Sequence, residues 1–132
     1  MDPIAELERR LAKHPELRFE ATASSVAVQA PSPEGFAVSF VVSGTECTVR
    51  FEGWHEDFTS VEQALDCFAF AFSGRSRLAI TYRGRIPVKW VLEHLEEGAW
   101  QADSEVGHFL VPFWKPKRVV YRQNPMLLRD AH

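Results

Sequence analysis

The stretch WHEDFTSVEQALDCFAF, residues 54–70, decides the fold because it sets a helix between two groups of strand-like segments. Thr59, with Glu62 three residues later, matches the capping box that begins many helices. Ser60 with Gln63 matches the same pattern equally well. Apolar residues then recur at helical spacing on one face, namely Val61, Ala64, Leu65, Phe68 and Phe72. The sequence therefore predicts a capped, buried helix in the middle of the chain.

This predicted helix, residues 60–73, is apolar on nearly all sides in its second half. Cys67, Ala69, Phe70 and Ala71 fill the flanks of the main stripe. A helix that is apolar all round is buried on more than one side. Either the sheet and another element enclose it, or the side around Phe70 is available to a second chain.

A second, shorter helix is predicted at the start of the chain. Asp2 suits the N-cap, and Pro3 suits the first helical position, where a missing N–H costs nothing. Ile4, Leu7 and Leu11 then form one apolar stripe. Because a helix of three or four turns is marginal alone in water, we expect this stripe to lie on the rest of the protein.

The remaining segments alternate between apolar and polar residues with a period of two, as strands with one buried face do. They are residues 17–21, 26–30, 36–42, 47–51, 77–83, 88–92, 99–103, 108–114 and 118–122. Strands grouped around two helices favour an α+β fold with an antiparallel meander sheet and the helices on one face. The expected order is α-β-β-β-β-α-β-β-β-β-β, with a single domain over residues 1–124 and a peripheral tail over residues 125–132.

Size and composition limit the class of protein. A chain of 132 residues with 45% hydrophobic and 12% aromatic residues suits one core. Two cysteines outside any CxxC pair do not form a disulfide framework. The first residues lack the features of a signal peptide, and the apolar run at 67–72 is far shorter than the roughly 20 residues of a membrane helix. We therefore expect a soluble, cytoplasmic protein without a membrane partner.

The net charge of −3 conceals an asymmetry between the two halves of the chain. Residues 1–66 contain 5 Lys or Arg against 12 Asp or Glu, whereas residues 67–132 contain 10 against 6. The two halves either face each other or create a patch of one sign that attracts a charged partner.

The residues WHED at 54–57 form the local cluster that most resembles a reactive site. On an extended segment His55 and Asp57 share one side, whereas Glu56 points to the other, so three ligands do not converge on a metal. Cys47 and Cys67 are of a type that is usually buried and inert. We interpret the cluster as a strand-to-helix connection and expect no catalytic residues, no metal and no cofactor.

A row of cations follows the predicted central helix. Arg75, Arg77, Arg83 and Arg85 all have odd numbers, so along a strand they line one face, and Lys89 extends the row across a turn. Such a row can hold phosphates, but the neighbouring aromatic residues belong by parity to the opposite, buried face. A solvated strand face is therefore favoured over a nucleic-acid site.

The segment VPFWKPKRVVY at 111–121 combines aromatic residues, cations and a proline. Lys and Pro commonly protect the edge strand of a sheet from another chain. Trp114 and Arg118 are equally of the types that dominate protein interfaces. The sequence leaves both interpretations open.

Taken together, these features favour a small binding module that acts by protein–protein contact, either as a homodimer or as a chaperone-like or inhibitor-like partner of another protein. One alternative is a small-molecule or enzymatic site between the sheet and the helix at 60–73. A second is a polyanion site on the hairpin at 75–89, which the acidic pI of about 5.9 disfavours. The candidate interaction residues are Trp54, His55, Phe70, Arg75, Arg77, Arg83, Arg85, Trp114 and Arg118.

Overall fold

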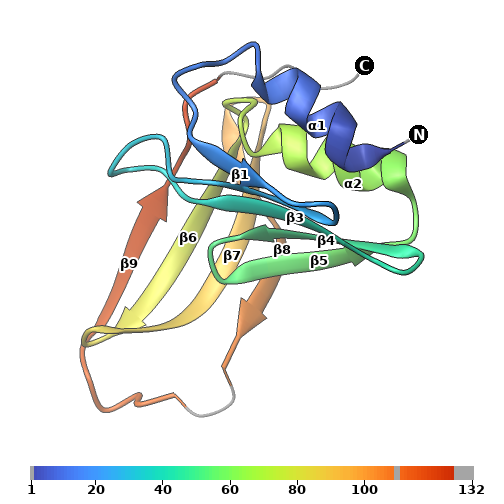
Figure 1. Cartoon of the computed structure of the whole chain (residues 1–132). Helices are drawn as coiled ribbons and strands as arrows, with labels where there is room; N and C mark the ends of the chain where they lie inside the picture. Colours follow the sequence, from blue (N-terminus) through green and yellow to red (C-terminus); the bar gives the residue numbers. More distant parts are fainter. Residues whose placement is uncertain (1, 109–110, 127–132) are drawn as a thin grey trace.

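The computed structural model of the chain describes residues 2–108 and 111–126 (Figure 1). Within them, the two helices are α1 (Pro3–Leu11) and α2 (Val61–Phe70). The nine strands are β1 (Phe19–Ala21), β2 (Ser25–Val28), β3 (Val38–Ser43), β4 (Glu46–Phe51), β5 (Trp54–Phe58), β6 (Ser76–Arg83), β7 (Ile86–Glu96), β8 (Ala99–Gly107) and β9 (Lys117–Arg122). The predicted α+β class and the sequence of helix, strands, helix and strands are confirmed.

The strands form two antiparallel sheets. Sheet A has the order β1-β2-β3-β4-β5, and each strand pairs with its neighbour in the chain. Sheet B has the order β8-β7-β6-β9, so the last strand returns to pair with β6. Both helices lie on the same face of sheet A, and sheet B extends away from them (Figure 1).

Both helices begin where the sequence places a capping side chain. The Asp2 carboxylate accepts a hydrogen bond from the Ile4 N–H at 3.0 Å. Of the two possible caps of α2 the structure uses the second, because the Ser60 hydroxyl accepts from the Gln63 N–H at 3.2 Å. These bonds satisfy N–H groups that the first turn leaves unpaired.

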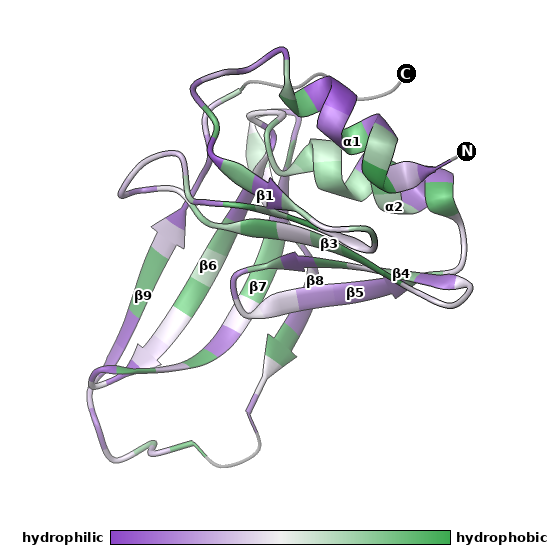
Figure 2. Cartoon of the chain, viewed as in Figure 1, coloured by the Kyte–Doolittle hydropathy of each residue, from purple (hydrophilic) through white to green (hydrophobic). Residues whose placement is uncertain are grey.

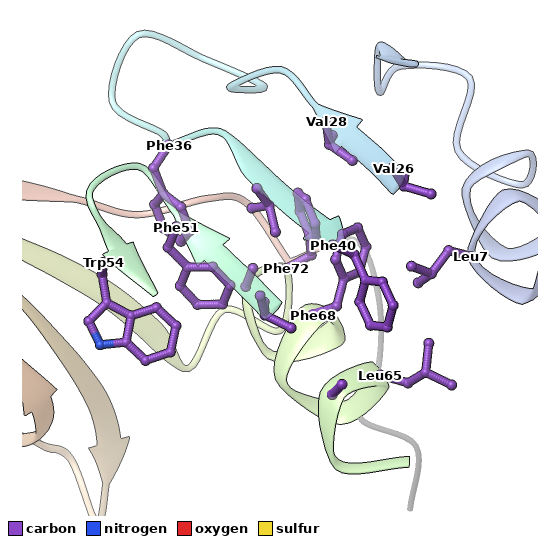
Figure 3. Packing of buried hydrophobic residues seen from close by; sticks show 14 of the residues in the cluster. Leu7, Val26, Val28, Phe36, Phe40, Phe51, Trp54, Leu65, Phe68 and Phe72 are labelled. Carbon is purple, nitrogen blue, oxygen red and sulfur yellow. The ribbon is translucent and has the colours of Figure 1, made fainter. Parts of the chain in front are cut away.

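The core is one continuous cluster that reaches from α1 to sheet B. Phe68 of α2 lies at its centre, with ring centroids 6.3 Å from Phe40 and 5.9 Å from Phe72 (Figure 3). A row of three rings, Phe36, Phe51 and Trp54, continues the cluster along sheet A. Sheet B adds three buried apolar side chains, Leu78, Ile80 and Leu92.

Two segments differ from the expectation. Residues 54–57, interpreted as a connection, belong to strand β5, because all five residues of that strand pair in register with β4 and Trp54 enters the core. The described part of 108–114 is not a strand, since Pro112 has no N–H to donate and a turn follows at 113–115. As a result, five strands precede α2 and four follow it.

The two sheets are fastened together at the end of β9. Asn124 is buried, its side-chain oxygen accepts from the Phe36 N–H at 2.8 Å, and its amide donates to the Phe36 carbonyl at 3.1 Å. The Arg122 guanidinium donates to the Pro33 carbonyl nearby. Most of the tail expected at 125–132 lies outside the described residues.

No helix in the described part of the chain has the length and apolar character that crossing a lipid bilayer requires.

Candidate functional site

A groove of about 580 Å³ lies where α2 meets the junction of the two sheets. Its apolar lining comes from three elements: Trp54 and Phe58 on β5, Cys67 and Phe70 on α2, and Leu92 on β7. This volume is within the range of about 300–1,000 Å³ that is typical of ligand pockets. The groove is therefore large enough to hold a small molecule or a side chain of another protein.

The charged lining of the groove is mainly acidic. Glu56, Asp66 and Asp103 contribute carboxylates from three different elements, against the guanidinium of Arg75 and the imidazole of His94. Burial raises the pKa of the Cys67 thiol strongly, and the nearby charges of Glu56 and Asp103 raise the pKa further. The lining of the groove thus disfavours negative charge, including the thiolate form of Cys67.

Hydrogen bonds fix two side chains of the groove. The Trp54 indole N–H donates to the Ser104 hydroxyl at 2.9 Å, which joins β5 to β8. His94 Nε2 lies 3.0 Å from Glu96 Oε2, and its Nδ1 lies 3.7 Å from Asp103 Oδ2. Among the described residues, the buried Nδ1 atom has no hydrogen-bond partner.

The carboxylates of the groove are distributed around it. Across residues 2–108 and 111–126, no three His, Cys, Asp or Glu side chains gather closely enough to hold a metal ion. A ligand that reaches all three acids must therefore be larger than a single ion.

A second surface is the face of sheet B that is turned away from the groove, here called the outer face. The register of the four strands places Arg77, Ala79, Val91, Tyr121 and Trp100 on it. Figure 2 shows apolar residues along β6, β7 and β9 without separating the two faces of the sheet, and both helices have their main strand contacts with sheet A. Tyr121, on the edge strand β9, is 53% exposed on this face.

The side chains of the outer face are ordered by one another. The Arg77 guanidinium stacks between two rings, 4.4 Å from the Trp100 centroid and 4.2 Å from the Tyr121 centroid. The same guanidinium pairs with the Glu93 carboxylate at 2.6 Å. Lys89 and Glu105 lie 3.7 Å apart on the same face. These charges are thus paired within the face.

The far end of sheet B is basic and carries two exposed aromatic rings. The Gly84 N–H donates to the Pro116 carbonyl at 2.8 Å, which holds the β6–β7 turn against the segment before β9. Phe113 and Trp114 stack edge to face and are 73% and 74% exposed. The cations of these two segments are Arg83, Arg85, Lys115, Lys117 and Arg118.

The structure separates the residues of the first predicted cluster. Trp54 is buried and lines the groove, and Phe70 is half-buried on the same wall. His55 and Asp57 share one side, as their parity predicted, but they lie on the exposed face of sheet A. There Asp57 accepts a hydrogen bond from the Thr48 hydroxyl at 2.6 Å.

The predicted row of cations is not continuous. Arg75 lines the groove, whereas Arg77 lies on the outer face of sheet B. Arg83 donates to the Phe113 carbonyl at 3.5 Å, and Arg85 is exposed in the following turn. Arg77 and Arg83 keep the predicted parity within β6, because the extra residue of the register shift after Thr81 lies on β7, whereas Arg75 precedes the strand and Arg85 follows it.

The predicted residues of the last segment lie at the far end of sheet B. Trp114 is exposed, and the Arg118 guanidinium lies 5.0 Å above the Tyr82 ring on the opposite face from Arg77. β9 is an edge strand, and it carries the cations that edge protection predicted.

Sequence reasoning missed several residues that the fold brings together. Glu56 shares the parity of Trp54, which would have placed it on the groove if the segment had been recognised as a strand. Asp103 and His94 reach the groove through pairing of β8 with β7, for which the sequence gives no local signal.

Comparison of the chain with protein-family models, with curated proteins and with solved structures finds no match.

Proposed function

We propose that this protein is a homodimeric interaction module and that two copies dock through the outer face of sheet B. The observation that carries this proposal is the stack of Trp100, Arg77 and Tyr121 on a sheet face that no described element covers. Trp, Tyr and Arg are the residue types that dominate interface hot spots. Their mutual stacking orders them before binding, which lowers the entropic cost of association.

The charges of this face favour burial against a second protein surface. An unpaired charge is costly to bury, whereas the Arg77–Glu93 and Lys89–Glu105 pairs keep their partners when the face is covered. The exposed apolar side chains around them, Ile86, Val119 and Tyr121, lose contact with water at the same time.

The distribution of the remaining charges favours a second copy of the chain as the partner. Glu96 and Glu97 lie at the β7–β8 turn, and the cations Arg85, Lys115 and Lys117 lie at the opposite end of sheet B. A two-fold axis that crosses the strands in the interface plane sets the basic end of each copy over the acidic end of the other. Such an isologous contact also sets Tyr121 against its own counterpart.

Sedimentation equilibrium of the whole chain across a concentration series tests the proposal. We expect a reversible monomer–dimer equilibrium that Tyr121→Glu weakens by at least about tenfold, because interface hot spots contribute about 2 kcal/mol or more. Val41→Glu is the matched control, since Val41 is a similarly exposed apolar residue on sheet A. A wild-type chain that stays monomeric throughout the series would refute the proposal.

A charge exchange tests the orientation of the two copies. Arg85→Glu and Glu97→Lys should each weaken the dimer, and combining them should restore part of the affinity, because the two residues flank opposite ends of β7, which this axis sets over each other. If the two effects simply add, the copies do not dock in this orientation.

A further inference from the structure

The groove between α2 and the two sheets combines aromatic walls with separated carboxylates, and this combination specifies a class of ligand. Phe58 and Phe70, which are half-buried, supply apolar surface over the buried Trp54, and Glu56, Asp66 and Asp103 supply negative charge around it. An anionic ligand would meet three carboxylates against the single guanidinium of Arg75, whereas a neutral apolar ligand would leave the excess negative charge uncompensated. A ligand with one cationic and one apolar part satisfies both parts of the lining.

The walls of the groove are arranged before any ligand arrives. The hydrogen bond from Trp54 to Ser104 and the 4.9 Å ring contact between Trp54 and Phe51 hold the indole in place. Phe70 projects from α2, whose buried stripe is fixed in the core. A site with rigid walls loses little conformational entropy on binding.

We propose that this groove binds an organic cation with an apolar stem, with an ammonium or guanidinium group among Glu56, Asp66 and Asp103 and the stem against Phe58 and Phe70. The spacing of the acids excludes the geometry of a metal site within the described residues and suits a group with several N–H donors. Glu56 and Asp103, which add to the effect of burial in raising the pKa of Cys67, also attract such a cation.

The same chemistry can come from a free amine or from a Lys or Arg side chain of another protein, so the experiment has two arms. In the first arm, the chain labelled with 15N is titrated with benzamidine and with hexylamine, and the indole N–H signal of Trp54 is followed by NMR. The neutral isosteres benzamide and hexanol are titrated in parallel. We expect a saturable shift with the cations and none with the neutral compounds.

In the second arm, the probe is a short peptide with a single central Lys, compared with the same peptide acetylated at Nζ. Binding of the unmodified peptide without binding of the small amines supports the proposal and assigns the cation to a protein side chain. The proposal is overturned if no cationic probe shifts the Trp54 signal. It is equally overturned if the neutral isosteres bind as tightly as the cations.

Substitutions in the acidic lining separate binding from folding. Glu56→Gln combined with Asp103→Asn should weaken cation binding by about tenfold or more, on the scale of lost charge pairs at a partly desolvated site. Both side chains are exposed, so the variant should keep the melting temperature of the wild type. Glu46→Gln, a similarly exposed acid at the start of β4, is the matched control and should bind as the wild type does. Unchanged affinity in the double variant would overturn the proposal.

This inference does not depend on the proposed dimer, because the groove and the outer face lie on opposite sides of sheet B. Titration of the Tyr121→Glu variant with benzamidine should give the wild-type affinity. Loss of binding in that variant would show that the groove is not an independent site.

Discussion

Asn124 illustrates how a single side chain can join two parts of a fold. Its amide group bonds both the N–H and the carbonyl of Phe36, and Phe36 is fully buried. Gly35 lies so close that an added Cβ would be 2.5 Å from the Asn124 side-chain oxygen. The residue therefore needs both a donor and an acceptor in a tightly limited space.

We expect Asn124→Ala to lower the free energy of unfolding by about 2–4 kcal/mol, since each buried polar group left without a partner costs about 1–3 kcal/mol. Asn124→Asp should destabilise as well, because a carboxylate cannot donate to the Phe36 carbonyl. Urea unfolding measures both effects. Gln123→Ala is the control, because the Gln123 side chain is exposed, and its unfolding curve should stay close to that of the wild type. An Asn124→Ala curve that coincides with this control would contradict the prediction.

The two cysteines, Cys47 and Cys67, are free thiols with low expected reactivity. Burial raises the pKa of both thiols, and Glu56 and Asp103 raise that of Cys67 further. Because the thiolate is the reactive form, a thiol with a raised pKa reacts slowly near neutral pH. We expect the native protein to resist iodoacetamide at neutral pH and the unfolded protein to take up two equivalents, as mass spectrometry measures. Rapid labelling of the native Cys67 would show that the groove does not oppose negative charge.

At the scale of elements, the sequence predicted what depends on local chemistry. The caps at Asp2 and Ser60 and the apolar stripes of α1 and α2 follow from spacing alone, and the structure contains them. The sequence did not predict strand β5, because its three consecutive polar residues, His55, Glu56 and Asp57, are typical of a loop. Only the pairing with β4, a contact between segments, turns those residues into a strand.

The Glu6 carboxylate makes the stability of helix α1 depend on pH. Hydrogen bonds from Arg9 and then Arg10 lower the pKa of Glu6 from 4.5 to about 2. Because the folded pKa lies below the unfolded one, the interaction stabilises the helix above about pH 4.5 and is lost as the pH falls through about 2. A carboxyl-detected NMR titration should give the lowered value for Glu6. Replacing both Arg9 and Arg10 by Gln should return the midpoint toward 4.5, and a midpoint that is already normal in the wild type would refute the prediction.

At the scale of the whole molecule, the fold class could be predicted and the candidate sites could not. The groove needs β5, α2, β7 and β8 to meet, and the outer face needs β9 to return beside β6. Neither event follows from the alternation of apolar and polar residues. That alternation shows which residues share a face of a strand, but it does not show which strands are neighbours. Phe70 was singled out because it lies off the main stripe, a local signal, whereas Asp103 carried none.

Gly53 and Trp90 lie in close contact at the junction of the two sheets. Gly53 precedes β5, and a Cβ added there would lie 2.3–2.6 Å from three ring atoms of Trp90 on β7. Real Cβ contacts are longer than 3.0 Å, so the ring and with it sheet B must shift in Gly53→Ala. We expect this variant to lose about 1–3 kcal/mol in urea unfolding. Gly107→Ala, whose added Cβ would come no closer than 3.6 Å to a neighbour, should unfold as the wild type does.

The destabilisation should disappear when the ring is made smaller. In a Trp90→Leu background the added methyl group has space, so Gly53→Ala should cost little there, and the double-mutant cycle should give a large coupling between the two positions. Because the core cluster is continuous between the sheets, fluorescence and far-UV circular dichroism should report the same unfolding transition in every variant. Separate transitions for the two signals, or a cost of Gly53→Ala that is the same in both backgrounds, would mean that the contact between Gly53 and Trp90 does not couple the sheets.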